Sequence, residues 1–173
     1  GVAELTVGMC TRVKDFASRQ LRDLCSRRTV SADDVIAYVT SLDAVTLLEA
    51  MRGSNSNGKT PLHYAAQLRT DADGATLCKA LLAHRADVDV TTRRGHTALL
   101  FASGRGHSDT ARVLLAARAN PCVIAANGDT ASSCAGASNL DDEAKELLAR
   151  AEASELRPGI DFRKSEDALV PQQ

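Results

Sequence analysis

One short pattern recurs three times along this chain, and the repetition limits the possible folds more than any other feature of the sequence. Each copy starts with glycine, has threonine two residues later and alanine seven residues later. The copies occupy residues 58–66, 95–103 and 128–136, and their glycines are 37 and 33 residues apart. Repeats of about this length are units that cannot bury their apolar face alone and therefore stack on their neighbours. The sequence predicts a solenoid.

The composition indicates that the repeated units are helical. Aromatic residues make up 3% of the chain and tryptophan is absent, which suits closely packed helices better than a sandwich or barrel. Thr60 and Thr97 are suited to cap a first helix, and Pro61 is suited to its first turn. A leucine pair follows each copy and predicts second helices over residues 78–84, 110–117 and 144–150.

The first copy, Gly58-Lys59-Thr60-Pro61-Leu62-His63-Tyr64-Ala65-Ala66, resembles the signature of the ankyrin repeat. Residues 81–89 resemble the closing segment of the same repeat. The resemblance implies an all-α ankyrin repeat solenoid of helix-turn-helix units with an N-terminal helical extension. It places three repeats at residues 55–91, 92–124 and 125–156. It also implies that His63 ties the first helix to the adjoining turn.

The chain departs from the ankyrin pattern at several positions. The first repeat has four extra residues between its helices, within residues 67–75, and this stretch is predicted to be a loop. Arg85 and Arg118 follow the second helices where the family usually has glycine, so we expect strain if the backbone there is left-handed. The third repeat has Ser132 and Ser133 at the usual leucine and histidine positions. Its charged second helix is expected to be a solvent-facing cap.

The flanking segments are predicted to be helical before the repeats and irregular after them. Residues 1–30 carry apolar side chains at helical spacing and predict an amphipathic helix, through which the chain could self-associate. Residues 31–54 predict two short helices, over 31–38 and 42–51, as a degenerate capping pair. Residues 157–173 are expected to form a tail or linker. The chain begins with glycine rather than methionine, and we expect it to be part of a longer protein.

The residue types that usually carry catalysis or metal binding show no recognisable arrangement. Four histidines and five cysteines include no Cys-x-x-Cys and no His-x-x-x-His spacing, so we expect no metal or other cofactor. The odd number of cysteines favours reduced, mostly buried thiols. His107-Ser108-Asp109 is interpreted as a helix start, with Ser108 or Asp109 as cap or first-turn acid, and not as a catalytic triad. We expect no enzymatic activity.

The charge balance limits the possible partners. The chain has 21 basic and 22 acidic residues, whereas a dedicated nucleic-acid binder usually has a strongly basic face. No apolar run approaches the ~20 residues that cross a bilayer, so no membrane partner is expected. The chain is expected to be intracellular, in the cytoplasm or nucleus.

The ankyrin resemblance implies a binding surface on the concave side of the stack, made by loop tips and first helices. It selects Lys59, Tyr64, Gln67, Leu68, Arg93, Arg94, His96, Phe101 and Arg105, with Asp129 on the third tip. Tyr64 and Phe101 occupy equivalent positions one repeat apart, and exposed aromatics flanked by arginines would form a binding hot spot. The alternative is that Phe101 only packs between repeats.

These observations favour a non-catalytic adaptor or scaffold that binds an acidic and apolar segment of another protein. Two further interpretations stay open. The chain could be the regulatory or targeting domain of a larger enzyme, or an ankyrin domain that binds RNA or an anionic ligand. Salt dependence of nucleic-acid binding would separate the last interpretation from the first.

Overall fold

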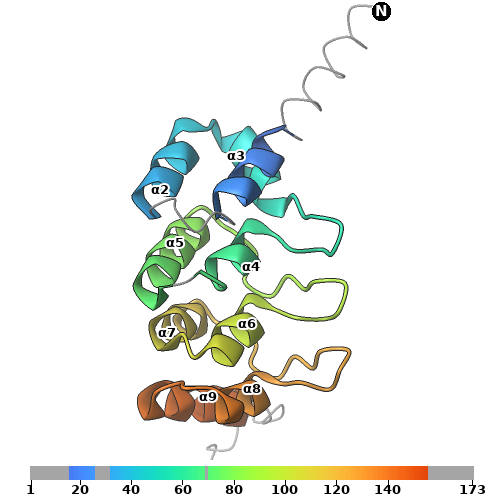
Figure 1. The fold of residues 1–173 in the computed structure, drawn as a ribbon, viewed down its shortest axis with the longest axis vertical. Coiled ribbons are helices and arrows are strands. Elements are labelled where there is room, and N and C mark those ends of the chain that lie inside the picture. The colour runs from blue at the N-terminus through green and yellow to red at the C-terminus, as the bar shows by residue number, and fades with distance from the viewer. Residues whose placement is uncertain (1–15, 26–31, 69, 156–173) are drawn as a thin grey trace, which may run out of the picture.

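The computed structural model describes residues 16–25, 32–68 and 70–155, and the regular structure in these ranges is helical (Figure 1). The helices are α2 (Ala32–Ser41), α3 (Ala44–Arg52), α4 (Pro61–Ala65), α5 (Asp71–Ala83), α6 (Ala98–Arg105), α7 (Ser108–Ala116), α8 (Ala131–Ala137) and α9 (Asp142–Glu155). Residues 16–25 are also helical. The all-α fold class predicted from the sequence is confirmed.

The repeats form two parallel rows of helices, with the loops between repeats on one side (Figure 1). The first helices α4, α6 and α8 stack on one another, and the second helices α5, α7 and α9 form the other row. Ala65, Ala102 and Ala135 are buried between the first helices, where their small side chains allow close approach. The buried apolar residues thus form one core that continues between neighbouring units.

The first helices begin where the sequence predicts. Pro61 is the first residue of α4, where its missing amide costs no hydrogen bond. The hydroxyl of Thr97 accepts a hydrogen bond from the Leu100 amide at 3.3 Å and caps α6. In the third repeat, Ser133 takes over one role of the usual histidine, because its hydroxyl accepts from the Thr130 amide at 2.9 Å.

The second helices α5 and α7 end in left-handed arginines. Arg85 has φ 64° and Arg118 has φ 63°, in the backbone region that favours glycine. After α5, the Ala86 amide donates to the Leu81 carbonyl at 3.1 Å, and the pattern repeats after α7. This is the Schellman arrangement that satisfies the last carbonyls of a helix. Both arginines thus meet the condition under which the sequence predicts strain, because the backbone at each is left-handed.

The extra residues of the first repeat are only partly a loop, and the sequence prediction for residues 67–75 is wrong over its second half. Helix α5 has 13 residues, against nine in α7, and its first turn begins at Asp71. The insertion therefore lengthens the second helix by about one turn. Asp71 and Asp73 lie in that turn, where acidic side chains favour the helix N-terminus.

The N-terminal helices cover the first repeat. Ala17, Leu21 and Cys25 are buried, and Phe16 is 66% exposed, so Ala17 supplies the core position of that turn. The apolar positions Val7, Cys10 and Val13, which the sequence assigns to the same helix, lie outside the described residues.

The two short helices of residues 31–54 differ slightly in extent from the prediction. Helix α2 continues to Ser41 rather than ending at Tyr38, and α3 starts after Asp43, whose carboxylate accepts from the Thr46 amide. Helix α2 packs on α5, in the row of second helices, and α3 packs beside α4. That residues 31–54 act as a degenerate pair of helices capping the repeats stays a proposal.

Candidate functional site

The loops between repeats position the candidate site. Loop 1 (residues 53–60), loop 2 (84–97) and loop 3 (117–130) each turn at a glycine with positive φ, at Gly58, Gly95 and Gly128. The Arg93 amide donates to the Asn57 carbonyl at 3.0 Å, and the Ala126 amide to the Arg94 carbonyl at 2.9 Å. These backbone bonds join neighbouring loops, so their side chains are presented by a fixed scaffold.

A groove of about 530 Å³ lies between loop 1 and loop 2. Its lining residues are Asn57, Lys59, Thr92, Arg93, Arg94, His96 and Phe101. None of these described residues is acidic, and three of them are lysine or arginine. The described lining of the groove is therefore basic in composition.

Phe101 forms the aromatic wall of this groove. Its ring stacks on His96, with ring centroids 5.3 Å apart, and meets the edge of His63 at 5.8 Å. The Nζ atom of Lys59 lies 4.8 Å from the centroid of the Phe101 ring, within the range of a cation–π interaction. Phe101 thus contacts side chains from two repeats and also faces the groove.

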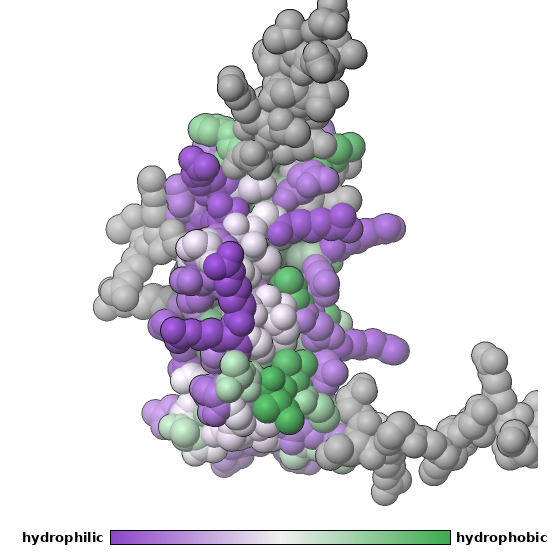
Figure 2. Space-filling model, turned by 90° about the vertical axis from the view of Figure 1, so that its right-hand side faces the viewer, coloured by the Kyte–Doolittle hydropathy of each residue, from purple (hydrophilic) through white to green (hydrophobic). Residues whose placement is uncertain are grey.

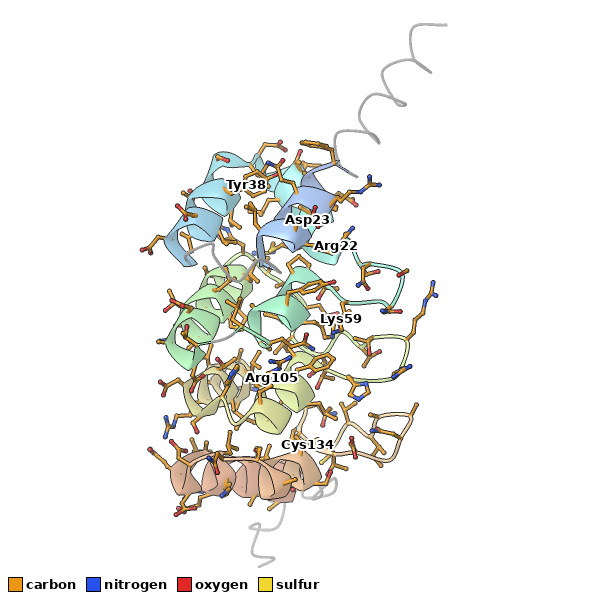
Figure 3. The ribbon with its side chains drawn as sticks, viewed as in Figure 1. Arg22, Asp23, Tyr38, Lys59, Arg105 and Cys134 are labelled. Atoms are coloured by element: carbon orange, nitrogen blue, oxygen red, sulfur yellow. The ribbon has the colours of Figure 1, made fainter. Side chains whose placement is uncertain are left out.

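Lys59 connects the groove to the first helix of the first repeat. Its Nζ donates a hydrogen bond to the Gln67 side-chain oxygen at 3.1 Å and lies 5.9 Å from the centroid of the Tyr64 ring. Burial lowers the pKa of Lys59, and the nearby Arg105 cation lowers it further. Figure 3 labels Lys59 and Arg105, which come from neighbouring repeats.

His63 holds the two repeats together beneath the groove. Its Nδ1 accepts from the Thr60 amide at 3.0 Å, and its Nε2 lies 3.1 Å from the His96 carbonyl oxygen in the next repeat. Because a carbonyl can only accept, Nε2 carries the proton. Burial lowers the pKa of His63 to about 4. The structural role that the resemblance implies for His63 matches these bonds.

The structure brings five of the nine predicted binding residues into the groove: Lys59, Arg93, Arg94, His96 and Phe101. Of the other four, Gln67 and Leu68 follow the end of α4 rather than lying within it. Tyr64 accepts a hydrogen bond from the Asn55 side chain at 2.8 Å, and Arg105 is the last residue of α6.

The aromatic pair predicted to be exposed is half-buried. Tyr64 and Phe101 both pack against the core. Asn57 and Thr92 line the groove and were not selected from the sequence. Their position on the loops next to Lys59 and Arg93 was the signal that could have identified them, but neither residue type indicates binding by itself.

Figure 2 views the molecule from the side of the loops. Polar side chains cover much of this side, with a hydrophobic patch toward the C-terminal repeats. Arg93 and Arg94 are exposed on loop 2, and Ile124 on loop 3 is 66% exposed. This side therefore offers both charged and apolar contacts.

The described residues offer little for covalent or metal chemistry. Within residues 16–25, 32–68 and 70–155, no group of three or more His, Cys, Asp or Glu side chains could hold a metal ion. Burial raises the pKa of Cys25 and of Cys78 to about 12, which keeps both thiols protonated and poorly nucleophilic. Cys134 is half-buried, and Cys10 lies outside the described ranges.

None of the helices in the described part of the chain is both long enough and apolar enough to span a bilayer.

The two rows of short helices joined by projecting loops define the chain as a helical repeat solenoid. The family model for ankyrin repeats, in three copies, matches residues 70–157. The chain therefore belongs to the ankyrin repeat family. A search of curated proteins finds no match to the chain. Ankyrin repeats are general protein–protein interaction modules and are typically not catalytic.

Proposed function

We propose that this ankyrin domain binds a segment of a partner protein in the groove between loop 1 and loop 2. The groove itself is the observation that carries this proposal. It combines the cations of Lys59, Arg93 and Arg94 with the aromatic wall of Phe101, and its described lining has no acidic residue. A segment with carboxylates beside an apolar side chain has matching chemistry.

The arrangement suits tight binding because the scaffold is already ordered. Backbone hydrogen bonds fix loop 2 to its neighbours through Arg93 and Arg94, so their side chains need no loop rearrangement to reach a partner. Arginine can bind a carboxylate with two parallel hydrogen bonds, which adds direction to the charge attraction. The apolar contact would come from Phe101 at the wall.

The experiment is an affinity purification with three forms of the protein, followed by mass spectrometry of the bound proteins. The forms are wild type, Arg94→Glu with Arg105→Glu, and the control Lys79→Glu with Arg85→Glu. Both variants change the net charge equally, and the control residues are exposed on α5 and just after it.

A partner that binds wild type and the control but not the Arg94/Arg105 variant is the expected result. A partner retained by all three forms would exclude this surface. Binding of RNA that falls steeply with salt and disappears in the Arg94/Arg105 variant would show that the groove binds phosphates instead.

A further inference from the structure

Loop 3 exposes an apolar side chain at a position where the other two loops are polar. Ile124 precedes the turn glycine Gly128 by four residues, and its side chain is 66% exposed. The residues at the same place in loop 1 and loop 2 are Ser54 and Thr91. Figure 2 shows that apolar surface on this side of the molecule gathers toward the C-terminal repeats. Loop 3 therefore offers an apolar contact that the other loops do not.

Loop 3 touches the groove between loop 1 and loop 2. The Ala126 amide of loop 3 donates to the carbonyl of Arg94 at 2.9 Å, and Arg94 lines the groove. A Cβ on Gly95, the next residue of loop 2, would lie 3.5 Å from the Ile124 carbonyl oxygen. Because the backbones of the two loops are in contact, Ile124 continues the surface that begins in the groove.

The charge of the loops changes along the stack. Lys59 of loop 1 and Asp129 of loop 3 hold the same position, directly after the turn glycine. The Asp129 carboxylate accepts a hydrogen bond from the Asn127 side-chain amide, which fixes it on loop 3. A carboxylate at this place repels other carboxylates. The acidic residues of a partner therefore fit at loop 2 and not at loop 3.

The two arginines of loop 2 are available to such acidic residues. Lys59 is held by its hydrogen bond to Gln67 and by the ring of Phe101. Arg93 and Arg94 are exposed, and neither guanidinium takes part in an ion pair within the described part of the chain. Each of them can bind a carboxylate with two parallel hydrogen bonds. Loop 2 thus supplies the charged contact and loop 3 the apolar one.

The distance between these two contacts determines their spacing in a partner. Helices that pack on one another lie about 8 to 10 Å apart, and each loop of this solenoid belongs to one repeat of the stack. An extended chain advances about 3.3 Å per residue. A segment that runs along the loops therefore has its apolar residue about three positions from its acidic residues.

We propose that the segment bound in the groove continues in extended form to loop 3, where an aliphatic side chain of the partner packs on Ile124. This inference rests on the proposed binding in the loop 1–loop 2 groove and specifies which segments fit there. Acidic residues contact Arg93 and Arg94, and a leucine, isoleucine or valine about three positions away contacts Ile124. Acidic segments without that aliphatic residue bind more weakly.

Selection of random peptides displayed on phage tests this specificity. The full chain is used as wild type, as Ile124→Ser and as the control Val45→Ser, whose 61% exposed side chain lies on α3. Wild type should select peptides with acidic residues and an aliphatic residue about three positions away. Ile124→Ser should keep the acidic residues and lose the aliphatic preference, whereas Val45→Ser should select as wild type does.

The outcomes separate this inference from the proposed groove. Acidic peptides without an aliphatic preference, or an aliphatic preference that Ile124→Ser retains, would overturn the inference and leave binding in the groove standing. Selected peptides without acidic residues would overturn both. Circular dichroism of the two variants should match that of wild type, because both replaced side chains are exposed.

The affinity of one selected peptide tests the contact itself. The peptide, and a copy with serine at the aliphatic position, are titrated against wild type and Ile124→Ser by fluorescence anisotropy. Each single change should weaken binding on the order of tenfold, because each removes the same apolar contact. Both changes together should weaken binding little more than either alone. Losses that multiply would show that the two side chains do not meet and would overturn the inference.

Discussion

At the scale of single residues, the second helices of this solenoid end in strained backbone. Arg85 and Arg118 adopt φ near +60°, where the Cβ atom of any residue other than glycine is crowded. Both side chains are exposed. Burial of these two side chains therefore does not offset the backbone strain.

Replacing either arginine by glycine should stabilise the protein. We expect Arg85→Gly and Arg118→Gly each to raise the free energy of unfolding by up to about 1 kcal/mol, measured by urea denaturation. The control is Arg150→Gly, inside α9, where glycine should cost about 1 kcal/mol instead. A lower unfolding midpoint for both Arg85→Gly and Arg118→Gly would contradict the strain argument.

His63 makes the stability depend on pH. Burial lowers its pKa to about 4 in the folded state, against an ordinary value of 6.5. The unfolded chain therefore binds more protons between these two values, and this contribution to stability is complete above pH 6.5. As the pH falls from 6.5 to about 4, on the order of 2 to 3 kcal/mol should be lost.

The measurement is the free energy of unfolding as a function of pH for wild type and His63→Asn. Asparagine cannot titrate, and its side-chain oxygen can still accept a hydrogen bond from the Thr60 amide. The variant should be less stable at neutral pH and should have a flatter curve between pH 4 and 6.5. Parallel curves for the two proteins would show that His63 is not the group responsible.

At the scale of elements, the added turn of α5 connects two repeats. The carboxylate of Asp71 accepts hydrogen bonds from the Asp109 amide at 2.7 Å and the Thr110 amide at 2.8 Å. The Thr110 hydroxyl donates to the same carboxylate at 2.8 Å. Asp71 thus caps the N-terminus of α7 from the neighbouring repeat. The sequence offers Ser108 or Asp109 as the cap or first-turn acid of α7. Asp109 lies in the first turn, whereas the Ser108 hydroxyl accepts from the Asp141 amide of the third repeat.

Removing this carboxylate should cost about 1 to 2 kcal/mol of stability, because it leaves two amides of α7 without their partner. We expect this loss for Asp71→Ala in thermal or urea unfolding. Asp73→Ala in the same turn is the control, since the Asp73 carboxylate accepts from the exposed Thr70 hydroxyl within the same repeat. Its effect should stay within about 0.5 kcal/mol. Equal losses for the two variants would exclude the inter-repeat cap.

The sequence predicts the helices well where local signals agree and less well where a neighbour decides. Thr97 and the leucine pairs mark helices correctly, because capping and apolar spacing act within one segment. Residues 71–75 contain Asp and Gly and were therefore predicted to be a loop. They are helical because Asp71 and Gly74 pack against the next repeat, where a Cβ on Gly74 would lie 2.8 Å from the Thr110 hydroxyl.

At the scale of the whole molecule, stability is distributed between neighbours along the stack. Leu81 on α5 is buried in the middle of the solenoid, and Leu148 on α9 is buried at its end. An ionic cluster joins the last two repeats, where Arg112 contacts Asp141 at 2.5 Å and Glu143 at 2.9 Å. The main contacts between the described helices join the same or adjacent units. A destabilising change in the middle of the stack should therefore affect more units than one at its end.

Hydrogen exchange should reveal whether a defect affects the whole stack or only its end. Leu81→Ala and Leu148→Ala each remove a buried leucine, at a typical cost of about 2 to 5 kcal/mol. The first should increase amide exchange throughout the repeats, because α5 contacts units on both sides. The second should increase exchange mainly in α8 and α9. Identical exchange patterns for the two variants would indicate one cooperative unit rather than a linear array.

The candidate groove could be predicted in part. The equivalence of repeat positions predicts Lys59, Arg94 and Phe101 as binding residues, because loops recur at a fixed place in each unit, and all three line the groove. Sequence could not show that Phe101 packs on His96, nor that Lys59 bonds Gln67. These contacts depend on side-chain directions across two repeats, which spacing along one chain does not specify.

The most direct test of a binding groove between loop 1 and loop 2 is site-specific photo-cross-linking in the native cell. A photoreactive amino acid would replace Asn57, which lines the groove, or Thr76, which is exposed on α5. Both positions are uncharged, so neither replacement changes the electrostatics. We expect a covalent partner adduct from position 57 and none from position 76. Adducts from position 76 alone would place the binding surface on the second helices and contradict this expectation.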